Sequence, residues 1–184
     1  MMQAARIESL QLIERSCWRE LANAASDRTH AWRVLVLATV DGDRADARSV
    51  VVRDVDAGQQ QVIFYSDARS AKVAQMRTHP RATLVGWWPA LGWQLRLRVA
   101  LAVETTGLDV SSRWARVKLS PSAQDYLAAL PPGTPVDRFQ PERGSREHFA
   151  VVTAAVQDID WLELHTDGHR RARLAGDASA WLVP

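Results

Sequence analysis

Twelve residues from Trp93 to Glu104 alternate between two kinds of side chain without a break, and this pattern limits the possible folds more than any other stretch of the chain. Every second residue is apolar, and the residues between them begin with Gln94, Arg96 and Arg98. Because successive side chains of a strand point to opposite faces, the alternation predicts a long strand with one buried face. The polar face is then open to a ligand or a partner subunit, or it is simply solvated.

Shorter apolar segments surround this strand and indicate the rest of the domain. We expect strands over 32–40 and 45–54 joined at Asp41-Gly42-Asp43, followed by a third at 61–66 in an antiparallel meander, and a hairpin of 81–88 with 92–104. A short helix should end near His79, since Pro80 disfavours helical geometry in the residue before it. The whole chain, 1–184, is expected to be a single α+β domain: an N-terminal helix at 4–24, a barrel core at 32–104, helices at 108–130 (108–119 and 121–130), and C-terminal strands at 148–183 (148–156, 159–165, 170–174 and 180–183). The antiparallel sheet should be closed, or nearly closed, into a barrel.

Charge and composition exclude several classes of protein. The 23 Lys and Arg against 21 Asp and Glu leave a net charge of +2, which is too small for sequence-independent binding of nucleic acid. Cys17 is the single cysteine, so an intramolecular disulfide and a multi-cysteine metal site are excluded. His165 and His169 are separated by a Gly168 turn rather than a helix, so no metal site is predicted. Without a signal-peptide core or a run of about 18 apolar residues, we expect a cytoplasmic protein that does not enter a membrane.

The motifs of hydrolases, nucleotide triphosphatases, Rossmann proteins and zinc proteases are absent. The residues that remain as candidates are basic and hydroxyl side chains suited to binding an anion. One part is the stretch Arg48-Ser-Val-Val-Val-Arg53. In a regular strand its two arginines lie about 17 Å apart and point to opposite faces. They therefore bind a long ligand lying along the strand, or have two separate tasks, or are solvated edge residues. A shared ligand would require a bulge or a wall supplied by a second subunit.

The other part follows the third strand, where Ser66 or Asp67 can cap a helix that carries Arg69, Ser70 and Lys72 in its first turns. A helix N-terminus offers free amide groups and a positive dipole end, and an arginine fork binds two phosphate oxygens at once. A phosphorylated small molecule is the ligand class that these residues favour. A capped surface helix with solvated charges is the alternative.

Four segments in this order resemble the pyridoxamine 5'-phosphate oxidase-like group of FMN-binding split-barrel proteins. They are Arg48 to Arg53, Phe64-Tyr-Ser-Asp-Ala-Arg-Ser-Ala-Lys72, His79-Pro-Arg-Ala82 and Leu91-Gly-Trp-Gln94-Leu-Arg96. The resemblance extends from about Trp32 to Glu104, and the tail from Phe149 is similar to the C-terminal strands of that group. It implies an antiparallel split β-barrel with peripheral helices, a homodimer with FMN at the subunit interface, and an FMN-dependent oxidoreductase whose small substrate can carry a phosphate.

The resemblance also implies roles for individual residues. Arg48, Ser66 and Lys72 would hold the FMN phosphate, with Arg69 and Ser70 in an Arg-Ser-x-Lys variant of the motif. The backbone of Ser49, Val50 and Val51 would lie along the flavin with Tyr65, and Gln94 would contact it. Arg53 would stand near the flavin and the substrate, where we expect it to stabilise negative charge on the reduced flavin as the catalytic residue.

The C-terminal part departs from the pattern of oxidases that act on the vitamin. These enzymes have an Arg-x-His pair and a flavin-contacting tryptophan, whereas this chain has Gly168-His169-Arg170, and Leu162 after Trp161. Arg171 and Arg173 are the remaining candidates to reach the cofactor. The loop 131–146 has no clear counterpart of the substrate-binding segment. A non-catalytic flavin-binding or sensing module, or a protein that binds haem or a deazaflavin on the same fold, are therefore alternatives.

Overall fold

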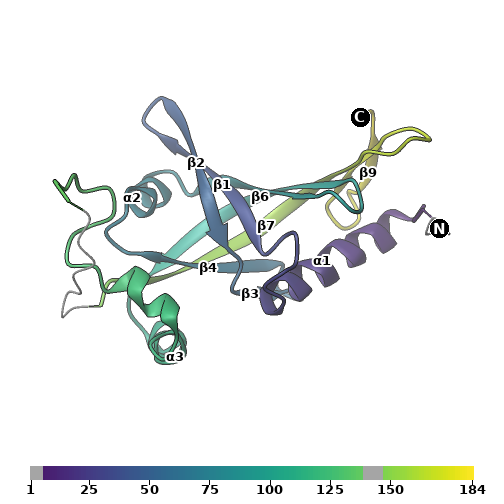
Figure 1. Cartoon of the computed structure of the whole chain (residues 1–184). Coiled ribbons are helices and arrows are strands. Elements are labelled where there is room, and N and C mark those ends of the chain that lie inside the picture. The colour runs from purple at the N-terminus through teal and green to yellow at the C-terminus, as the bar shows by residue number, and fades with distance from the viewer. Residues whose placement is uncertain (1–5, 139–146) are drawn as a thin grey trace.

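The alternating stretch forms a strand as predicted, β6 (Trp93–Glu104), and this strand lies in the middle of the sheet. The computed structural model describes residues 6–138 and 147–184 (Figure 1). The other strands of the described residues are β1 (Val34–Asp41), β2 (Arg44–Val51), β3 (Asp54–Asp56), β4 (Gln61–Asp67), β5 (Arg81–Trp88), β7 (Phe149–Glu163), β8 (Arg170–Leu174) and β9 (Ala180–Leu182). The helices are α1 (Leu10–Ser26), α2 (Ala71–Thr78), α3 (Leu108–Val117) and the 3₁₀ helix η1 (Pro121–Tyr126).

The expected strands at 148–156 and 159–165 are in fact one strand of 15 residues, β7. Val99 pairs with Val156 and Arg98 with Asp158, so Gln157 is an extra residue that forms a β-bulge. The bulge breaks the alternation in the sequence, and a broken alternation predicts the end of a strand. On the edge away from β6, the first half of β7 pairs with β4 and the second half with β8, which divides the sheet into a barrel and an extension.

The barrel closes where the chain crosses from one edge of the sheet to the other. The strand order is β2-β1-β5-β6-β7-β4-β3, so β2 and β3, which are consecutive in sequence, lie at opposite ends of it. The N–H of Val52 donates to the carbonyl of Arg33 at 2.9 Å, and the N–H of Arg53 donates to the carbonyl of Ile63 at 2.8 Å. The expected strand 45–54 is therefore interrupted after Val51, and β4 does not continue a meander beside β2.

The helices also begin and end at different residues from those expected. Helix α1 begins at Leu10, where the Ser9 hydroxyl accepts from the Leu12 N–H, rather than at residue 4; residues 4 and 5 lie outside the described residues. Helix α2 ends before His79 as predicted, but its N-cap is Ser70 rather than Ser66 or Asp67. The expected helix 121–130 is only the short 3₁₀ helix η1, and of the loop 131–146 the part 139–146 is not described.

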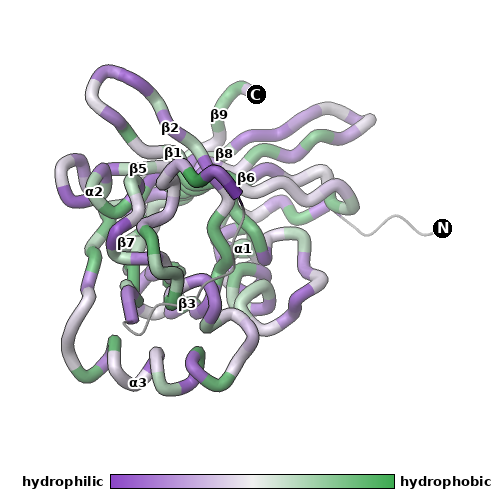
Figure 2. The backbone as a smooth tube through the Cα atoms, turned by 60° about the vertical axis from the view of Figure 1, so that its left-hand side comes forward, coloured by the Kyte–Doolittle hydropathy of each residue, from purple (hydrophilic) through white to green (hydrophobic). Residues whose placement is uncertain are grey.

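The core fills the barrel and the space beneath α1. Figure 2 shows hydrophobic backbone segments around the inside of the barrel and a hydrophilic tip on the projecting β1–β2 hairpin. Five tryptophan rings form a continuous network, with neighbouring centroids 5.4 to 6.4 Å apart: Trp88, Trp32, Trp93, Trp161 and Trp181. No helix in 6–138 or 147–184 is long and apolar enough to span a membrane. The fold is the predicted α+β class, an antiparallel split barrel with peripheral helices.

Candidate functional site

Arg48 lies at the end of the barrel that α2 covers. It pairs across the sheet with Leu37, whose side chain is in the core, so Arg48 points to the inner side of β2. Its guanidinium donates to the Oε1 atom of Gln75 on α2 at 2.8 Å and also contacts Thr39 and Asp46. The Gln75 amide donates to Asp46 at 2.9 Å, which closes the network. Arg48 is therefore held in one orientation between β2 and α2 before any ligand binds.

Lys72 comes from the first turn of the same helix. Burial lowers the pKa of this lysine, and the positive charge of Arg48 lowers it further. Among the described residues, no carboxylate lies within ion-pair distance of Lys72, although the more distant Asp67 partly offsets the repulsion. A half-buried ammonium group beside a second cation is a position where a bound anion would relieve both burial and repulsion.

Ser66 and Ser70 meet beside the start of α2, and both are buried. Their hydroxyl oxygens are 3.0 Å apart, and Ser70 also donates to the Asp67 carbonyl at 2.8 Å. Of the residues expected to bind phosphate, the structure therefore brings Arg48, Ser66, Ser70 and Lys72 to one end of the barrel. The hydroxyls already have partners within the chain, so a bound phosphate would compete with these contacts.

Arg69 has different contacts from those expected of a phosphate ligand. Its guanidinium pairs with the buried Asp67 carboxylate at 2.7 Å and donates to the carbonyls of Ala128 and Ala129 at 2.9 and 3.3 Å. These contacts join the segment after η1 to the start of α2. Arg69 therefore positions the site, and its guanidinium is not directed to an open anion position.

Arg53 and Tyr65 form a second group. The Arg53 guanidinium lies 5.8 Å from the centre of the Tyr65 ring, within cation-π distance, and it hydrogen-bonds to the Tyr126 hydroxyl of η1. Burial raises the pKa of Tyr126, so this phenol remains protonated at neutral pH. Because the chain crosses between sheet edges at Val52 and Arg53, the two arginines of the motif reach different surroundings without a bulge in β2.

Ser49 and Val51 point to the outer face of the sheet, and so do Gln94, Arg171 and Arg173. Pairing places Ser49, Val36, Val85, Arg96, Asp160 and Arg173 in one row across six strands. Five strand spacings of about 4.8 Å separate the ends of this row by roughly 24 Å along the sheet. One chain therefore does not bring Gln94, Arg171 and Arg173 to the group around Arg48.

Arg171 is already paired within the chain. It donates to both oxygens of the buried Asp160 carboxylate, at 3.0 and 2.7 Å. Burial alone would raise the pKa of Asp160, but the hydrogen bond from Arg171 and the charges of Arg171, Arg96 and Arg98 hold it below its usual value. Arg173, in contrast, is exposed on β8.

Several residues of the site were not expected from the sequence. Gln75 and Asp46 orient Arg48, while Arg113 and Tyr126 form the wall around Arg53 and Tyr65. Burial would lower the pKa of Arg113, but hydrogen bonds to Tyr65, Asp109 and Asp54 raise it above its usual value. Gln75 lies one helical turn after Lys72, a spacing that could have marked it, whereas no local pattern links Tyr126 to Arg53.

The arrangement fits FMN at two points. Lys72 and Arg48 provide a cationic end without enough acidic partners, which suits a phosphate. Strand β2 is the terminal strand of the sheet order, so its outer edge has no strand partner among the described residues and can offer N–H and carbonyl groups to a flat ring. Arg48 and this open edge belong to the same strand, as a ligand with a phosphate tail and a ring requires.

Comparison with known proteins gives the same cofactor. The family model "Pyridoxamine 5'-phosphate oxidase, FMN-binding domain" matches residues 15–105. A pyridoxine/pyridoxamine 5'-phosphate oxidase from Xanthomonas euvesicatoria is 30% identical over 145 residues, which cover 76% of this chain and 65% of that protein. One from Caulobacter vibrioides is 37% identical over 65 residues, 35% of this chain and 28% of that protein. These alignments therefore span less than two thirds of either relative.

Solved structures share the fold over nearly the whole chain. A pyridoxamine 5'-phosphate oxidase-related, FMN-binding protein from Nostoc punctiforme superposes with a TM-score of 0.73 at 22% identity and covers 92% of this chain and 96% of its own. PhzG from Burkholderia lata gives a TM-score of 0.71 at 19% identity, covering 98% and 95%. The matched domain binds FMN, and the chain belongs to the pyridoxamine 5'-phosphate oxidase-like family.

Proposed function

We propose that the protein is an FMN-dependent oxidoreductase that acts on a small substrate and works as a homodimer with FMN at the subunit interface. The observation that carries this proposal is the pair of cations at the α2 end of the barrel. Arg48 is oriented by Gln75, and Lys72 is half-buried without an ion-pair partner among the described residues. A fixed guanidinium with a nearby ammonium is suited to a phosphate monoester such as that of FMN.

The outer face of the sheet supports the second copy. Val34, Val36 and Trp87 are 48%, 42% and 44% exposed on neighbouring strands β1 and β5, although each has an apolar side chain. Apolar residues that share one face of a sheet favour burial against another surface. A second copy of the chain on this face would also bring its own Gln94, Arg171 or Arg173 toward the β2 edge, which one chain cannot do.

FMN would supply the redox chemistry by accepting a hydride from the substrate, and the chain would supply orientation and charge. Arg48 and Lys72 would fix the phosphate and therefore the position of the ring along β2. Arg53, held by Tyr65 and Tyr126, would place a positive charge where negative charge develops on the reduced ring system. The cover formed by α3 and η1 would exclude water from this end.

The visible spectrum of the purified protein tests the cofactor. We expect flavin absorbance, or quenching of tryptophan fluorescence when FMN is added to the apoprotein, because Trp114 packs against Tyr126, which lies beside Arg53. A colourless protein whose fluorescence does not change at micromolar FMN would contradict the proposal. A haem Soret band, or binding of a deazaflavin in place of FMN, would assign the fold to another cofactor.

A non-catalytic flavin-binding or sensing module is the second candidate. The observation that favours it is the pairing of Arg171 with Asp160, because it occupies a guanidinium that was expected to reach the cofactor. Aerobic incubation of the FMN-loaded protein with pyridoxamine 5'-phosphate tests one substrate of the oxidase type. Formation of the aldehyde product supports that oxidase, whereas stable oxidised flavin with this compound and with other reduced substrates supports the module.

A further inference from the structure

We propose that Asp46 is a specificity-determining residue of the anion site at the α2 end of the barrel: its carboxylate occupies Arg48 in the ligand-free chain, and a phosphate must exchange with it. This inference rests on the proposed function, because it takes the phosphate of FMN as the incoming group. Asp46 lies two residues before Arg48 on β2, so strand alternation places both on the inner side of the strand. It lies outside the segments that resemble the FMN-binding family.

One carboxylate oxygen of Asp46 is held by two donors. Its Oδ2 atom accepts from the Nη2 atom of Arg48 and from the Nε2 atom of Gln75, the latter at 2.9 Å. A guanidinium and an amide that converge on one anionic oxygen are also suited to a phosphate oxygen. The Oδ2 atom of Asp46 therefore occupies a position that an oxygen of the ligand would take.

The other partners of Arg48 differ from Asp46 in charge and in burial. Thr39 and Gln75 are neutral and buried. The Oε1 atom of Gln75 accepts from Arg48 at 2.8 Å and from the Thr39 hydroxyl at 2.7 Å, so this part of the network does not depend on Asp46. The Asp46 side chain is 44% exposed and can turn into water, where its charge is solvated. Asp46 is thus the exchangeable partner, and the two neutral residues keep the guanidinium in place.

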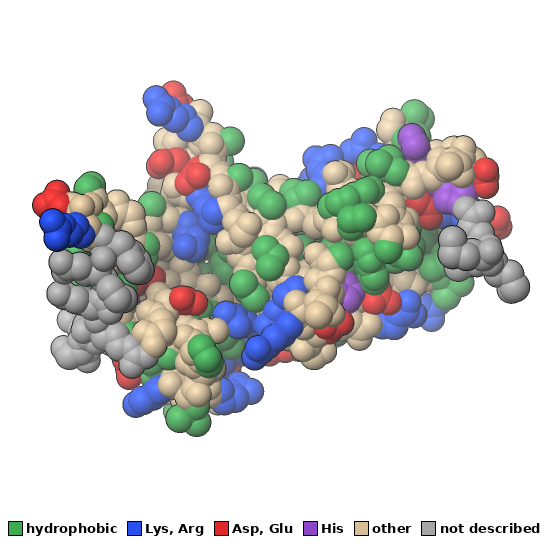
Figure 3. All heavy atoms as spheres, viewed as in Figure 1, with side chains coloured by type: hydrophobic (Ala, Val, Ile, Leu, Met, Phe, Trp, Pro, Cys, Tyr) green, Lys and Arg blue, Asp and Glu red, His purple; other side chains and the backbone are tan. Residues whose placement is uncertain are grey.

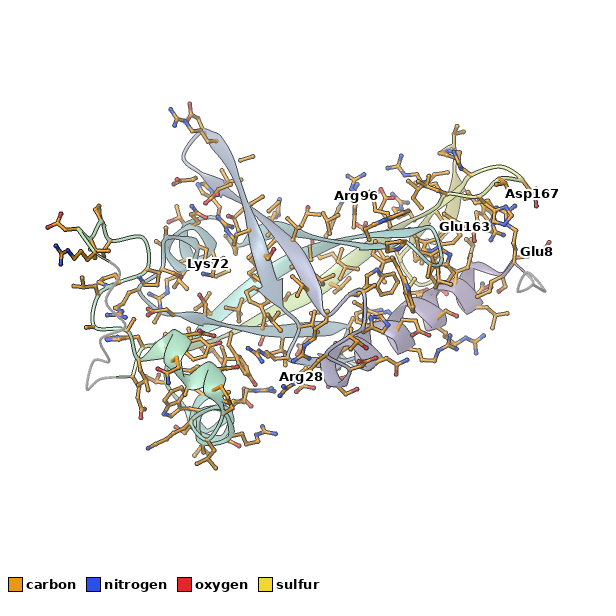
Figure 4. The ribbon with its side chains drawn as sticks, in the orientation of Figure 1. Glu8, Arg28, Lys72, Arg96, Glu163 and Asp167 are labelled. Carbon is orange, nitrogen blue, oxygen red and sulfur yellow. The ribbon has the colours of Figure 1, made fainter. Side chains whose placement is uncertain are left out.

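The exchange takes place at the base of the projecting β1–β2 hairpin. Figure 4 places Lys72 on α2 beside this base, and α2 packs against β1. Figure 3 shows acidic and basic side chains next to one another along the hairpin. An anion that enters here meets Arg48 from the strand and Lys72 from the helix.

The balance of charge gives the direction of the exchange. Within 6–138 and 147–184, Asp46 is the one carboxylate within ion-pair distance of Arg48, and Lys72 has none. A phosphate dianion carries more charge than a carboxylate and has enough oxygens to contact both cations. A carboxylate on a ligand would only replace Asp46 by a group of equal charge. The site therefore favours phosphate and excludes simple carboxylates.

Asp46 stays ionised over the pH range in which a phosphate monoester titrates. The hydrogen bond from Gln75, together with the charge and hydrogen bond of Arg48, holds the pKa of Asp46 below its usual value. A phosphate monoester loses its second proton near about pH 6. The charged groups around the site are Arg48 and Asp46 on β2, Lys72 on α2 and Asp67 at the end of β4. The charge of the ligand can therefore be varied while that of Asp46 is constant.

Titration of the apoprotein with FMN and with riboflavin tests the role of Asp46. Asp46→Asn keeps the shape and an acceptor oxygen but removes the charge, so it should bind FMN about fivefold more tightly at neutral pH and riboflavin within about twofold of the wild type. Asp43→Asn, at the hairpin tip, removes the same charge from a side chain that is 98% exposed, and should match the wild type. Asp46→Ser is the second variant if Asp46→Asn does not fold. Unchanged or weaker FMN binding in the folded variant would overturn the proposal.

The pH dependence of this gain separates exchange from simple repulsion. If the carboxylate leaves, its displacement costs the same for a monoanion and a dianion, so the ratio of FMN affinities between variant and wild type should be constant between about pH 5 and 8. If the carboxylate stays beside the phosphate, it repels the dianion more strongly, and the ratio should rise through about pH 6. That rise would overturn the exchange.

Acetate tests the exclusion of simple carboxylates. Added acetate should compete with FMN in Asp46→Asn at concentrations that have no effect on the wild type or on Asp43→Asn, when ionic strength is held constant. Equal competition in all three proteins would show that Asp46 does not determine specificity.

Inorganic phosphate separates this inference from the proposed function. If the wild-type chain binds no FMN, the proposed function fails, and the same comparison is made with phosphate by calorimetry. Phosphate binding that is tighter in Asp46→Asn than in Asp43→Asn, and lost in Arg48→Ala, would support the exchange independently of FMN. Phosphate binding that is equal in Asp46→Asn and Asp43→Asn, or absent from both, would overturn it.

Discussion

The two arginines of the Arg48 to Arg53 stretch lie on either side of the point where β2 ends, and they are held by different kinds of neighbour. At the α2 end, Arg48 is fixed by an amide, a hydroxyl and a carboxylate that lie within its own hairpin or on α2. At the other end, Arg53 is held by an aromatic face and a phenol from β4 and η1, with Arg33 beside it. The first environment suits a compact dianion, whereas the second suits the charge of a ring or of a bound substrate.

This difference leads to separate expectations for the two ends. A change at the α2 end should alter the preference for FMN over riboflavin, which lacks the phosphate. A change at the Arg53 end should affect both flavins equally. Each of the following experiments can break this division.

Replacing Arg48 should have the largest effect. Arg48→Ala removes charge-assisted hydrogen bonds to the phosphate, so FMN should bind about 100-fold more weakly while riboflavin binding changes less than about threefold. Fluorescence titration with both flavins measures the ratio, and Arg44→Ala, at the exposed hairpin tip, is the control. Equal losses for the two flavins would remove the phosphate role.

Arg69→Ala should lower stability rather than the flavin ratio. The change leaves the buried Asp67 carboxylate without its partner and frees the Ala128 and Ala129 carbonyls, so the free energy of unfolding should fall by about 2 kcal/mol. Urea denaturation measures this loss. The double variant Asp67→Asn/Arg69→Ala should recover part of it, and a change of the FMN to riboflavin ratio as large as that of Arg48→Ala would show that Arg69 binds phosphate after all.

Arg53→Ala should weaken FMN and riboflavin by the same factor, about tenfold, because Arg53 is expected to face the ring and not the phosphate. It should also lower the reduction potential of the bound flavin, since a positive charge near the reduced ring is lost. Redox titration with a reference dye measures this potential. A selective loss of FMN would place Arg53 at the phosphate.

Lys72→Met should change the stability of the apoprotein least, and it should raise the stability, whereas Arg69→Ala lowers it. The pKa of Lys72 is lower in the folded chain than in the unfolded chain, so the unfolded state binds more protons between these two values. Stability of the wild-type apoprotein should therefore rise with pH from the folded pKa up to the unfolded value. The variant should lose this rise and be more stable at neutral pH by less than about 1 kcal/mol, while binding FMN more weakly. Thermal unfolding at several pH values measures both trends.

The α2 end could be predicted from the sequence because its residues lie in two short segments, one a strand and the other a helix that must end before Pro80. Pro80 marks the end of α2, although the predicted cap at Ser66 or Asp67 was wrong, and the face of the strand on which Arg48 lies follows from strand alternation. The Arg53 end could not be predicted in the same way. Its walls come from the turn after α1 and from η1, which are joined to Arg53 only by tertiary packing, and the crossing at Val52 has no local sequence signal.

The bulge in β7 made this part of the fold harder to predict. Gln157 interrupts the alternation, so the sequence predicts two strands where the structure has one. The register of this strand with β6 could not be deduced for the same reason. The pairing of Arg171 with Asp160 depends instead on the register of β7 with β8, which the bulge does not shift.

The crossing at Val52 and Arg53 also has a consequence for amide hydrogen exchange. Two backbone hydrogen bonds fix this crossing: the Val52 N–H extends the pairing of β2 with β1, and the Arg53 N–H extends the pairing of β3 with β4. A fluctuation that breaks both would release the crossing residues from the two edges of the sheet, so ligand binding at Arg53 and the ordering of the crossing would share one equilibrium. A flavin bound along the Arg48 to Arg53 stretch would then slow exchange most at these two amides.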